Sequence, residues 1–133
     1  MTFRQALHEF LRDTIDVPVY DARLPLRPMM PALVQSFVAA SSIHTHSGPS
    51  TLLERRVQID AFANNDPEAD QLAARLLYAL DGYHGTMNGV DVGYVELVSD
   101  VEMDPAEIKG GEVRYRRVLD FMVGYQDVQE VSS

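Results

Sequence analysis

The fold is decided by one stretch, residues 56–82, which reads RVQIDAFANNDPEADQLAARLLYALDG. In its first part every second residue is apolar, beginning with Val57, Ile59 and Ala61. Successive side chains of a strand point to opposite faces, so this period of two predicts a strand that buries one face. We place this strand at residues 52–63.

The second part of the stretch changes to helical spacing. The run Asn64-Asn65-Asp66-Pro67 predicts a helix start, with Asp66 as the N-cap and Pro67 at the first helical position. Asp81-Gly82 ends the helix. The apolar residues between these signals recur at intervals of three and four, which predicts a continuous buried stripe of Ala69, Leu72, Ala73, Leu76, Leu77 and Leu80.

Upstream of this unit the sequence predicts a second helix. Residues 2–14 alternate apolar and polar side chains at three- and four-residue spacing, the pattern of an amphipathic helix. Thr2 is a suitable N-cap, and Val17-Pro18 stops the helix because the residue before proline avoids helical backbone angles.

A Pro-rich arm follows the first helix, at residues 18–31. It contains four prolines, at positions 18, 25, 28 and 31. Proline has no backbone N–H to donate, so we expect an extended segment without regular strand pairing. Tyr20, Leu24 and Leu26 would hold this arm against the body.

Three more strands complete the expected sheet, at residues 32–41, 90–101 and 112–125. Between them we expect a loop over Ser42–Ser50, rich in Ser, His, Gly and Pro, and a second loop bounded by Pro105 and Gly110-Gly111. In the final strand the apolar alternation breaks at Arg117, which would share the face of its apolar neighbours.

These elements predict an α+β fold. The expected order is α-β-β-α-β-β, with two helices packed on one face of a four-stranded, mainly antiparallel sheet and with an extended arm and loops. We expect one domain over residues 1–133: an N-terminal helix at 1–14, the arm at 18–31, sheet plus helix at 32–125, and a flexible tail at 126–133.

Composition excludes several classes of protein. The 133 residues are 46% apolar and 23% charged, which suits one folded core and argues against wholesale disorder. The absence of cysteine excludes a disulfide scaffold, a thiolate metal site and a cysteine nucleophile. No apolar run has the length of a membrane span or the flanks of a secretory signal, so we expect a soluble protein made in the cytoplasm, with no membrane partner.

Charge is distributed unevenly along the chain. The net charge is −9, from 11 basic and 20 acidic residues, and residues 67–133 contribute −8 of it. A surface this acidic does not bind nucleic acid broadly, because that affinity depends on Lys and Arg at the phosphates.

The histidines give one weak indication of a metal site. His44 and His46 could reach one ion from an extended loop, joined by Asp60 or His84. The alternative, exposed loop histidines without a metal, suits the Ser, Thr, Gly and Pro around them. The patterns of a nucleophile elbow, a dinucleotide-binding loop and a phosphate-binding loop are absent, so we expect neither an enzyme nor a cofactor.

Arginines cluster at the start of two predicted strands, in Arg55-Arg56 and in Arg114-x-Arg116-Arg117. If these strands pair, four or five guanidinium groups would gather at one edge. They could bind Glu54, Asp60 or Asp120 within the subunit, or they could meet the acidic loop of a second copy, a heterologous contact that can close into a ring. For the second reading, the expected interface residues are Arg55, Arg56, Arg114, Arg116, Asp100, Glu102, Asp104 and Glu107, with loop contacts from His44 and His46.

Taken together, these segments resemble the tail completion proteins of long-tailed phages, the tail terminator or tail-to-head joining family, which also occurs in prophages and gene transfer agents. The resemblance is carried by the early helix, Val19-Tyr20 and the Pro-rich arm, the strand Arg56–Ala63, the helix that ends in Leu80-Asp81-Gly82, and the closing strand Tyr115–Phe121. It covers roughly residues 1–125. The acid-rich stretch from Asp91 to Gly111 departs from the family pattern.

The resemblance implies a structural protein of the virion with no catalytic motif. It implies a homohexameric ring at the head–tail junction, which caps the tail tube protein and offers a docking face to the head-side connector or stopper protein. An acidic lumen would let DNA pass without specific binding, because like charge denies it phosphate contacts. Two other readings stay open: a small oligomeric ligand-binding module of ferredoxin-like type, and a metal-dependent enzyme that uses His44 and His46.

Overall fold

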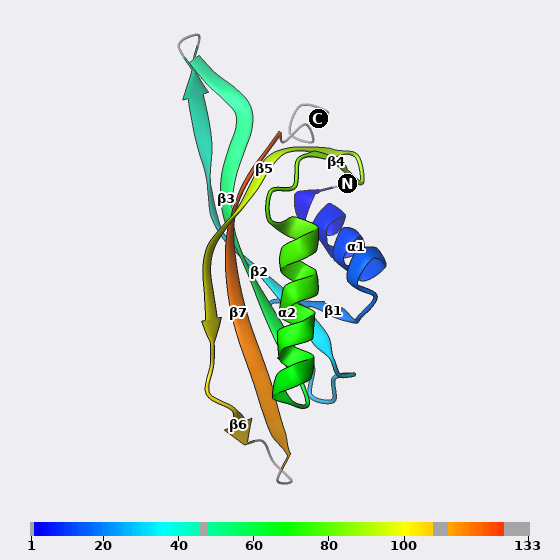
Figure 1. Cartoon of the computed structure of the whole chain (residues 1–133). Helices are drawn as coiled ribbons and strands as arrows, with labels where there is room; N and C mark the ends of the chain where they lie inside the picture. The colour runs from blue at the N-terminus through cyan, green and yellow to red at the C-terminus, as the bar shows by residue number, and fades with distance from the viewer. Residues whose placement is uncertain (1, 46–47, 108–111, 127–133) are drawn as a thin grey trace.

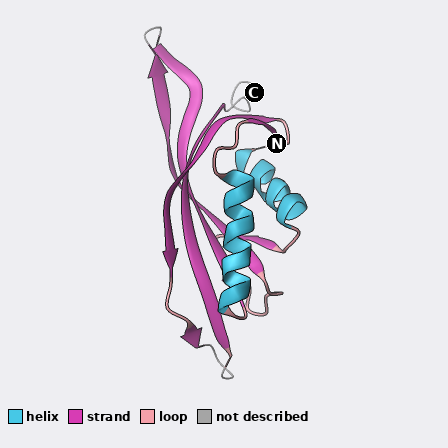
Figure 2. Ribbon diagram, viewed as in Figure 1, coloured by secondary structure: helices cyan, strands magenta, loops and turns pink. Residues whose placement is uncertain are grey.

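The computed structural model describes residues 2–45, 48–107 and 112–126. Within these ranges the chain forms two helices and seven strands (Figures 1 and 2). In chain order they are α1 Phe3–Ile15, β1 Val19–Asp21, β2 Ala32–Thr45, β3 Gly48–Ala63, α2 Asp66–Leu80, β4 Gly85–Met87, β5 Val90–Glu102, β6 Ala106–Glu107 and β7 Val113–Gln126.

The strands form a mixed, strongly twisted sheet in the order β1-β2-β3-β7-β5-β4, with the short β6 paired to the start of β7. β1 runs parallel to β2, and the other pairs of the described strands are antiparallel. Both helices lie against one face of this sheet, so its other face carries no helix (Figure 1).

The expected four-stranded sheet in the order α-β-β-α-β-β is therefore wrong. Three additional strands, β1, β4 and β6, are only two or three residues long, too short to leave an alternating pattern in the sequence. β1 lies inside the Pro-rich arm, where Val19–Asp21 contains no proline and can pair with Leu33–Gln35. Of the three anchors expected for the arm, Leu26 is 93% exposed, and Val19 is buried instead.

The loop expected at Ser42–Ser50 is also wrong. β2 continues to Thr45 and β3 begins at Gly48, so the two strands form one long hairpin that projects beyond the helices (Figure 1). Polar residues can pair through their backbones without burying a side chain, and a pattern of apolar residues therefore does not reveal such a hairpin. Residues 46–47, with His46, and residues 127–133 of the expected tail lie outside the described residues.

Side chains at the helix starts explain where the helices begin. Thr2 is the N-cap of α1, and a reciprocal pair of hydrogen bonds with Gln5 completes a capping box. The N-cap of α2 is Asn65 rather than the expected Asp66, because the Asn65 Oδ1 accepts a hydrogen bond of 2.9 Å from the backbone of Glu68.

The buried side chains gather between the helices and the sheet. Leu72, Ala73, Leu76 and Leu80 of α2 form one core cluster with the alternate residues of β3 and β7 that point toward the helices, and Ala69 is also buried. Leu77 of the expected stripe is only partly buried. This arrangement follows from the amphipathic stripe of a helix meeting the apolar face of a sheet.

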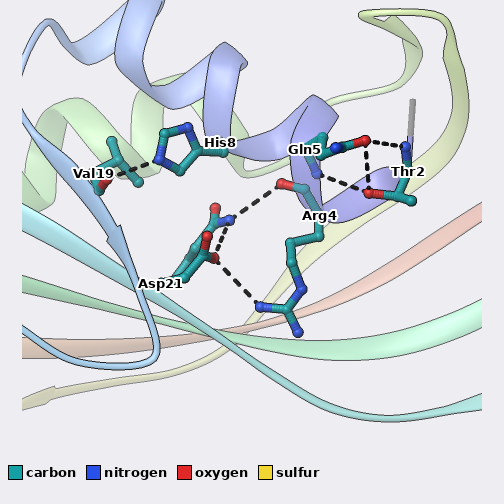
Figure 3. A network of polar contacts seen from close by, with 7 residues as sticks. Thr2, Arg4, Gln5, His8, Val19 and Asp21 are labelled. Atoms are coloured by element: carbon teal, nitrogen blue, oxygen red, sulfur yellow. Dashed lines mark hydrogen bonds and ion pairs between the residues drawn. The ribbon is translucent and has the colours of Figure 1, made fainter.

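A polar network ties α1 to the parallel strand pair (Figure 3). Gln35 of β2 is fully buried, and its Nε2 donates to the Asp21 carboxylate at 2.8 Å and to the Arg4 carbonyl at 3.2 Å. The His8 Nε2 donates to the Val19 carbonyl at 2.8 Å. These bonds hold the arm's first residues against α1, in addition to the buried Val19 side chain.

We predict that Leu76→Ala lowers the free energy of unfolding by about 3 kcal/mol, because it leaves a cavity at a fully buried position in the core. Urea unfolding followed by circular dichroism measures the change. Gln71→Ala, at an exposed position of the same helix, should change the free energy by no more than about 0.5 kcal/mol. Equal effects of the two substitutions would contradict the packing of α2 on the sheet.

Candidate interaction surface

The open face, as we call the helix-free face of the sheet, carries a set of polar and charged side chains. They are Arg56, Gln58 and Asp60 of β3, Arg116 and Asp120 of β7, and Ser99 of β5, and the apolar Phe62, Val118 and Met122 share this face. These residues alternate with core residues such as Val57 and Phe121, so the pleat of the strands places them opposite the helices.

Asp60 is the centre of one group on the open face. Its carboxylate accepts two hydrogen bonds from the Arg116 guanidinium, at 2.6 and 3.0 Å, and one from the Gln58 amide at 2.9 Å. The Asp60 side chain is only 8% exposed, whereas that of Arg116 is 38% exposed. Arg116 also lies 5.6 Å from the centre of the Phe62 ring. Such pairing keeps a buried carboxylate compatible with folding.

Asp120 is the centre of a second group. It accepts from Ser99 at 3.0 Å and from Arg56 at 3.3 Å, which joins β5, β7 and β3. The Arg56 side chain is 46% exposed, so this ion pair contributes little stability and leaves the guanidinium accessible.

The two arginine clusters do not gather, although β3 and β7 do pair. In the antiparallel register Arg56 lies opposite Met122 and Phe62 lies opposite Arg116. The clusters are therefore separated by six residues along the ladder, about 20 Å. Arg55 points away from this face: its Nε donates to the Val38 carbonyl at 3.0 Å, and its guanidinium lies 5.1 Å from the Phe37 ring centre.

Arg117 links three elements on the helix-covered side of the sheet. It donates to both oxygens of Asp100 in β5, at 2.6 and 2.7 Å, and to Asp70 of α2 at 2.7 Å. The hydrogen bonds to Asp100 raise the pKa of Arg117 above its ordinary value. Arg117 and Asp70 were not among the expected interface residues, and the break in alternation at Arg117 was the signal that could have found them.

The Tyr94 side chain extends from β5 across β7 at Gly124. A Cβ at Gly124 would lie 2.1 Å from the Tyr94 ring, so the absence of a side chain there lets the ring pass over β7. The Tyr94 hydroxyl then donates to the Glu54 carboxylate of β3. Burial, together with this hydrogen bond, raises the pKa of the Tyr94 phenol to about 12.

Several expected interface residues remain unpaired within the part of the chain that the structure describes. Arg114, Glu102, Asp104 and Glu107 make no side-chain hydrogen bond or ion pair there, and the three acids are exposed. They lie on β5, β6 and β7 or in the turn between β5 and β6, at the end of the sheet that carries β6. Asp100, in contrast, is bound by Arg117.

Of the proposed metal ligands, His44 and Asp60 are far apart, and His46 lies outside the described residues. His44 is part of β2, in register with Pro49, whereas Asp60 pairs with Val34, ten residues earlier on β2 and about 30 Å away along the strand. Asp60 is moreover occupied by Arg116 and Gln58. Within residues 2–45, 48–107 and 112–126, no three His, Asp or Glu residues are placed to hold a metal ion.

The core offers little room for a ligand. A cavity between α1, α2 and the sheet has a volume of about 10 Å³ and is lined by apolar side chains that include Leu7, Leu80 and Phe121. This is room for about one water molecule.

Neither described helix is long and apolar enough to cross a membrane.

Solved structures with a similar fold include the following two. One is a chain in a structure described as the virion of a native gene transfer agent particle, with 15% identity and a TM-score of 0.62 over 95% of this chain and 96% of that chain. A second, whose name states no function, has 16% identity and a TM-score of 0.52 over 92% and 90% of the two chains. No protein-family model and no curated protein sequence matches the chain.

We predict that Asp60→Asn lowers the free energy of unfolding by about 2 kcal/mol, because it weakens charged hydrogen bonds to a buried acceptor. A double-mutant cycle with Arg116→Gln should give a coupling of about 1 kcal/mol. Asp104→Asn is the matched control, since Asp104 is exposed, and it should change stability by less than about 0.5 kcal/mol. Zero coupling would show that the pair does not form.

We also predict that one of the six tyrosines ionises near pH 12 in an ultraviolet titration, and that Tyr94→Phe removes this transition. The phenol pKa is raised in the folded state, so its stabilisation is complete below pH about 10 and is lost as the pH rises through about 12. Glu54→Gln and Gly124→Ala should each lower the Tyr94 pKa, because they weaken or displace the hydrogen bond. An unchanged pKa in both variants would contradict this contact.

Proposed function

We propose that this chain is a structural protein of a phage-like virion, with no catalytic role. The observation that carries the proposal is the fold shared with a chain of the gene transfer agent particle, over almost the full length of both chains. We further propose that it forms a homohexameric ring at the head–tail junction, where it terminates the tail tube, joins the tail to the head connector, or does both.

One edge of β5 is largely unpaired among the described residues, which supports assembly with other chains. In this part of the chain β4 pairs with β5 only at Val90–Val92. The residues just after α2 bind two further positions, where Gly82 donates to the Val95 carbonyl and Asp81 accepts from the Leu97 backbone. Beyond them, Val98 and Val101 are about half exposed. An exposed strand edge with apolar side chains is unfavourable in an isolated protein and favourable where a partner covers it.

The charged side chains at the end of the sheet that carries β6 suit a contact between subunits or with a partner protein. Of the residues expected at interfaces, Arg116 and Asp100 are neutralised mainly within the subunit. We therefore assign the intersubunit or partner contacts chiefly to Arg114, Asp104 and Glu107, whose side chains have no partner among the described residues. Opposite charges on separate surfaces favour head-to-tail packing, which closes into a ring when the rotation permits.

The remaining acidic surface is suited to a channel. With a net charge of −9, a ring of such subunits would repel DNA phosphates and let the genome slide through without specific binding. The partners in this proposal are the tail tube protein on one axial face and the head-side connector or stopper on the other, within a particle assembled in the host cytoplasm.

We predict that the purified protein, alone or mixed with tail tubes, gives a hexamer by size-exclusion chromatography with light scattering and a ring with a central hole in negative-stain micrographs. A protein that stays monomeric in both conditions, and whose removal leaves tail length and head attachment normal, would contradict the proposal.

A charge-reversal pair tests the assigned contact. Arg114→Glu should weaken ring formation or partner binding about tenfold at low salt, while the circular dichroism spectrum stays unchanged. Arg114→Lys is the matched control and should retain most of the association. Equal assembly of the Glu and Lys variants would show that Arg114 does not lie at the interface, and it would not contradict the proposed ring.

A further inference from the structure

An apolar groove lies between the two helices, apart from the open face and from the β5 edge. It has a volume of about 610 Å³. Its lining includes Phe10 and Ile15 of α1, Tyr78 and Ala79 of α2, and Tyr83 just after α2. Most of these side chains are apolar or aromatic, so the groove offers a hydrophobic surface to whatever occupies it.

Several defined contacts fix the residues around the groove. The Phe10 and Tyr83 rings meet edge to face, with centres 5.2 Å apart, and the Tyr83 hydroxyl donates to the Thr86 carbonyl at 3.1 Å. The Arg75 guanidinium donates to the Ile15 carbonyl and so joins the two helices. Tyr78 stands beside this framework with 94% of its surface exposed, which is unusual for an aromatic side chain on a packed helix.

The Pro-rich arm contains the complementary feature. Between β1 and β2, Leu26 is 93% exposed and Met29 is 72% exposed. Pro25, Pro28 and Pro31 restrict the backbone around them, so the arm loses little conformational freedom when it docks. Extended Pro-rich segments bind aromatic-lined grooves for this reason.

We infer that the arm of one subunit docks in the groove of a second copy, with Leu26 and Met29 against Tyr78 and Phe10. This inference rests on the proposed ring and names one of its contacts. Within a single subunit the arm does not fill the groove, since no residue of 22–31 lines it and both apolar side chains are exposed. The contact joins two different surfaces, so it is heterologous and can repeat around a ring.

Charge favours this occupant over a generic apolar segment. Residues 22–31 carry Arg23 and Arg27 and no acidic residue, in a chain with a net charge of −9. Asp13 and Asp16 are exposed and are neighbours in the chain of the groove-lining Thr14 and Ile15, at the carboxyl end of α1, which itself bears partial negative charge. Arg75, which lines the groove, is already bound to the Ile15 carbonyl.

The native chain has no cysteine, which allows a direct test by disulfide trapping. Leu26→Cys protein and Tyr78→Cys protein, carrying different tags, are mixed with tail tubes and oxidised mildly. We expect a disulfide-linked heterodimer, because the inference brings the two Cα atoms within the few ångströms that a disulfide requires. Separate chains exclude a bond within one subunit. Leu26→Cys mixed with Asn64→Cys, at an exposed position before α2 for which no contact is proposed, should give about tenfold less product.

A second measurement uses substitutions at exposed positions, which leave the fold unchanged. Leu26→Asp and Tyr78→Ala should each weaken association between subunits about tenfold. Tyr78→Phe keeps the aromatic side chain and should assemble normally. Normal rings with no Leu26–Tyr78 crosslink would overturn the docked arm and leave the proposed function standing. Normal rings of the Tyr78→Ala variant that fail to bind tail tubes would assign the groove to the tube protein instead. A protein that is monomeric in every condition would overturn both.

Discussion

The antiparallel ladder between β3 and β7 is the constraint on which the rest of the structure depends. Its twelve register pairs run without interruption from Leu52 opposite Gln126 to Ala63 opposite Tyr115. Side chains alternate along both strands, so this register decides at once which residues face the helices and which face away. A slip by one residue would exchange the two sets and place the carboxylate of Asp60 in the core.

The polar open face is a consequence of that register. Asp60 accepts from Arg116 of β7 and from Gln58 of its own strand, and Asp120 accepts from Arg56 of β3 and Ser99 of β5, so each carboxylate is satisfied without a helix above it. Arg117 performs the same role on the covered side, where it joins β7 to β5 and to α2. Charges that stood out in the sequence are thus divided between internal pairs and residues that remain available at the end of the sheet.

The parts left uncovered lie at the periphery: the edge of β5, the Pro-rich arm, and the groove between the helices. Each carries apolar side chains that the subunit itself does not bury. The core, by contrast, encloses only about 10 Å³. A body that is well packed inside and apolar at several outer surfaces is better suited to assembly than to binding a small ligand, and this distribution is the physical basis of the structural role that we propose.

The sequence by itself determined the elements with strong local signals. The helix that ends at Leu80 and the Thr2 cap could be predicted because caps and apolar spacing act over a few residues. The start of α2 was displaced by one residue, because Asn65 and Asp66 are equally suitable caps by type. Only the tertiary structure decided the three short strands, the extension of the hairpin through polar residues, and the partners of each arginine. Backbone pairing and ion pairs between β3, β5 and β7 depend on the register between segments that are up to 64 residues apart, as in the pair of Arg56 with Asp120. The local sequence of each strand does not determine that register.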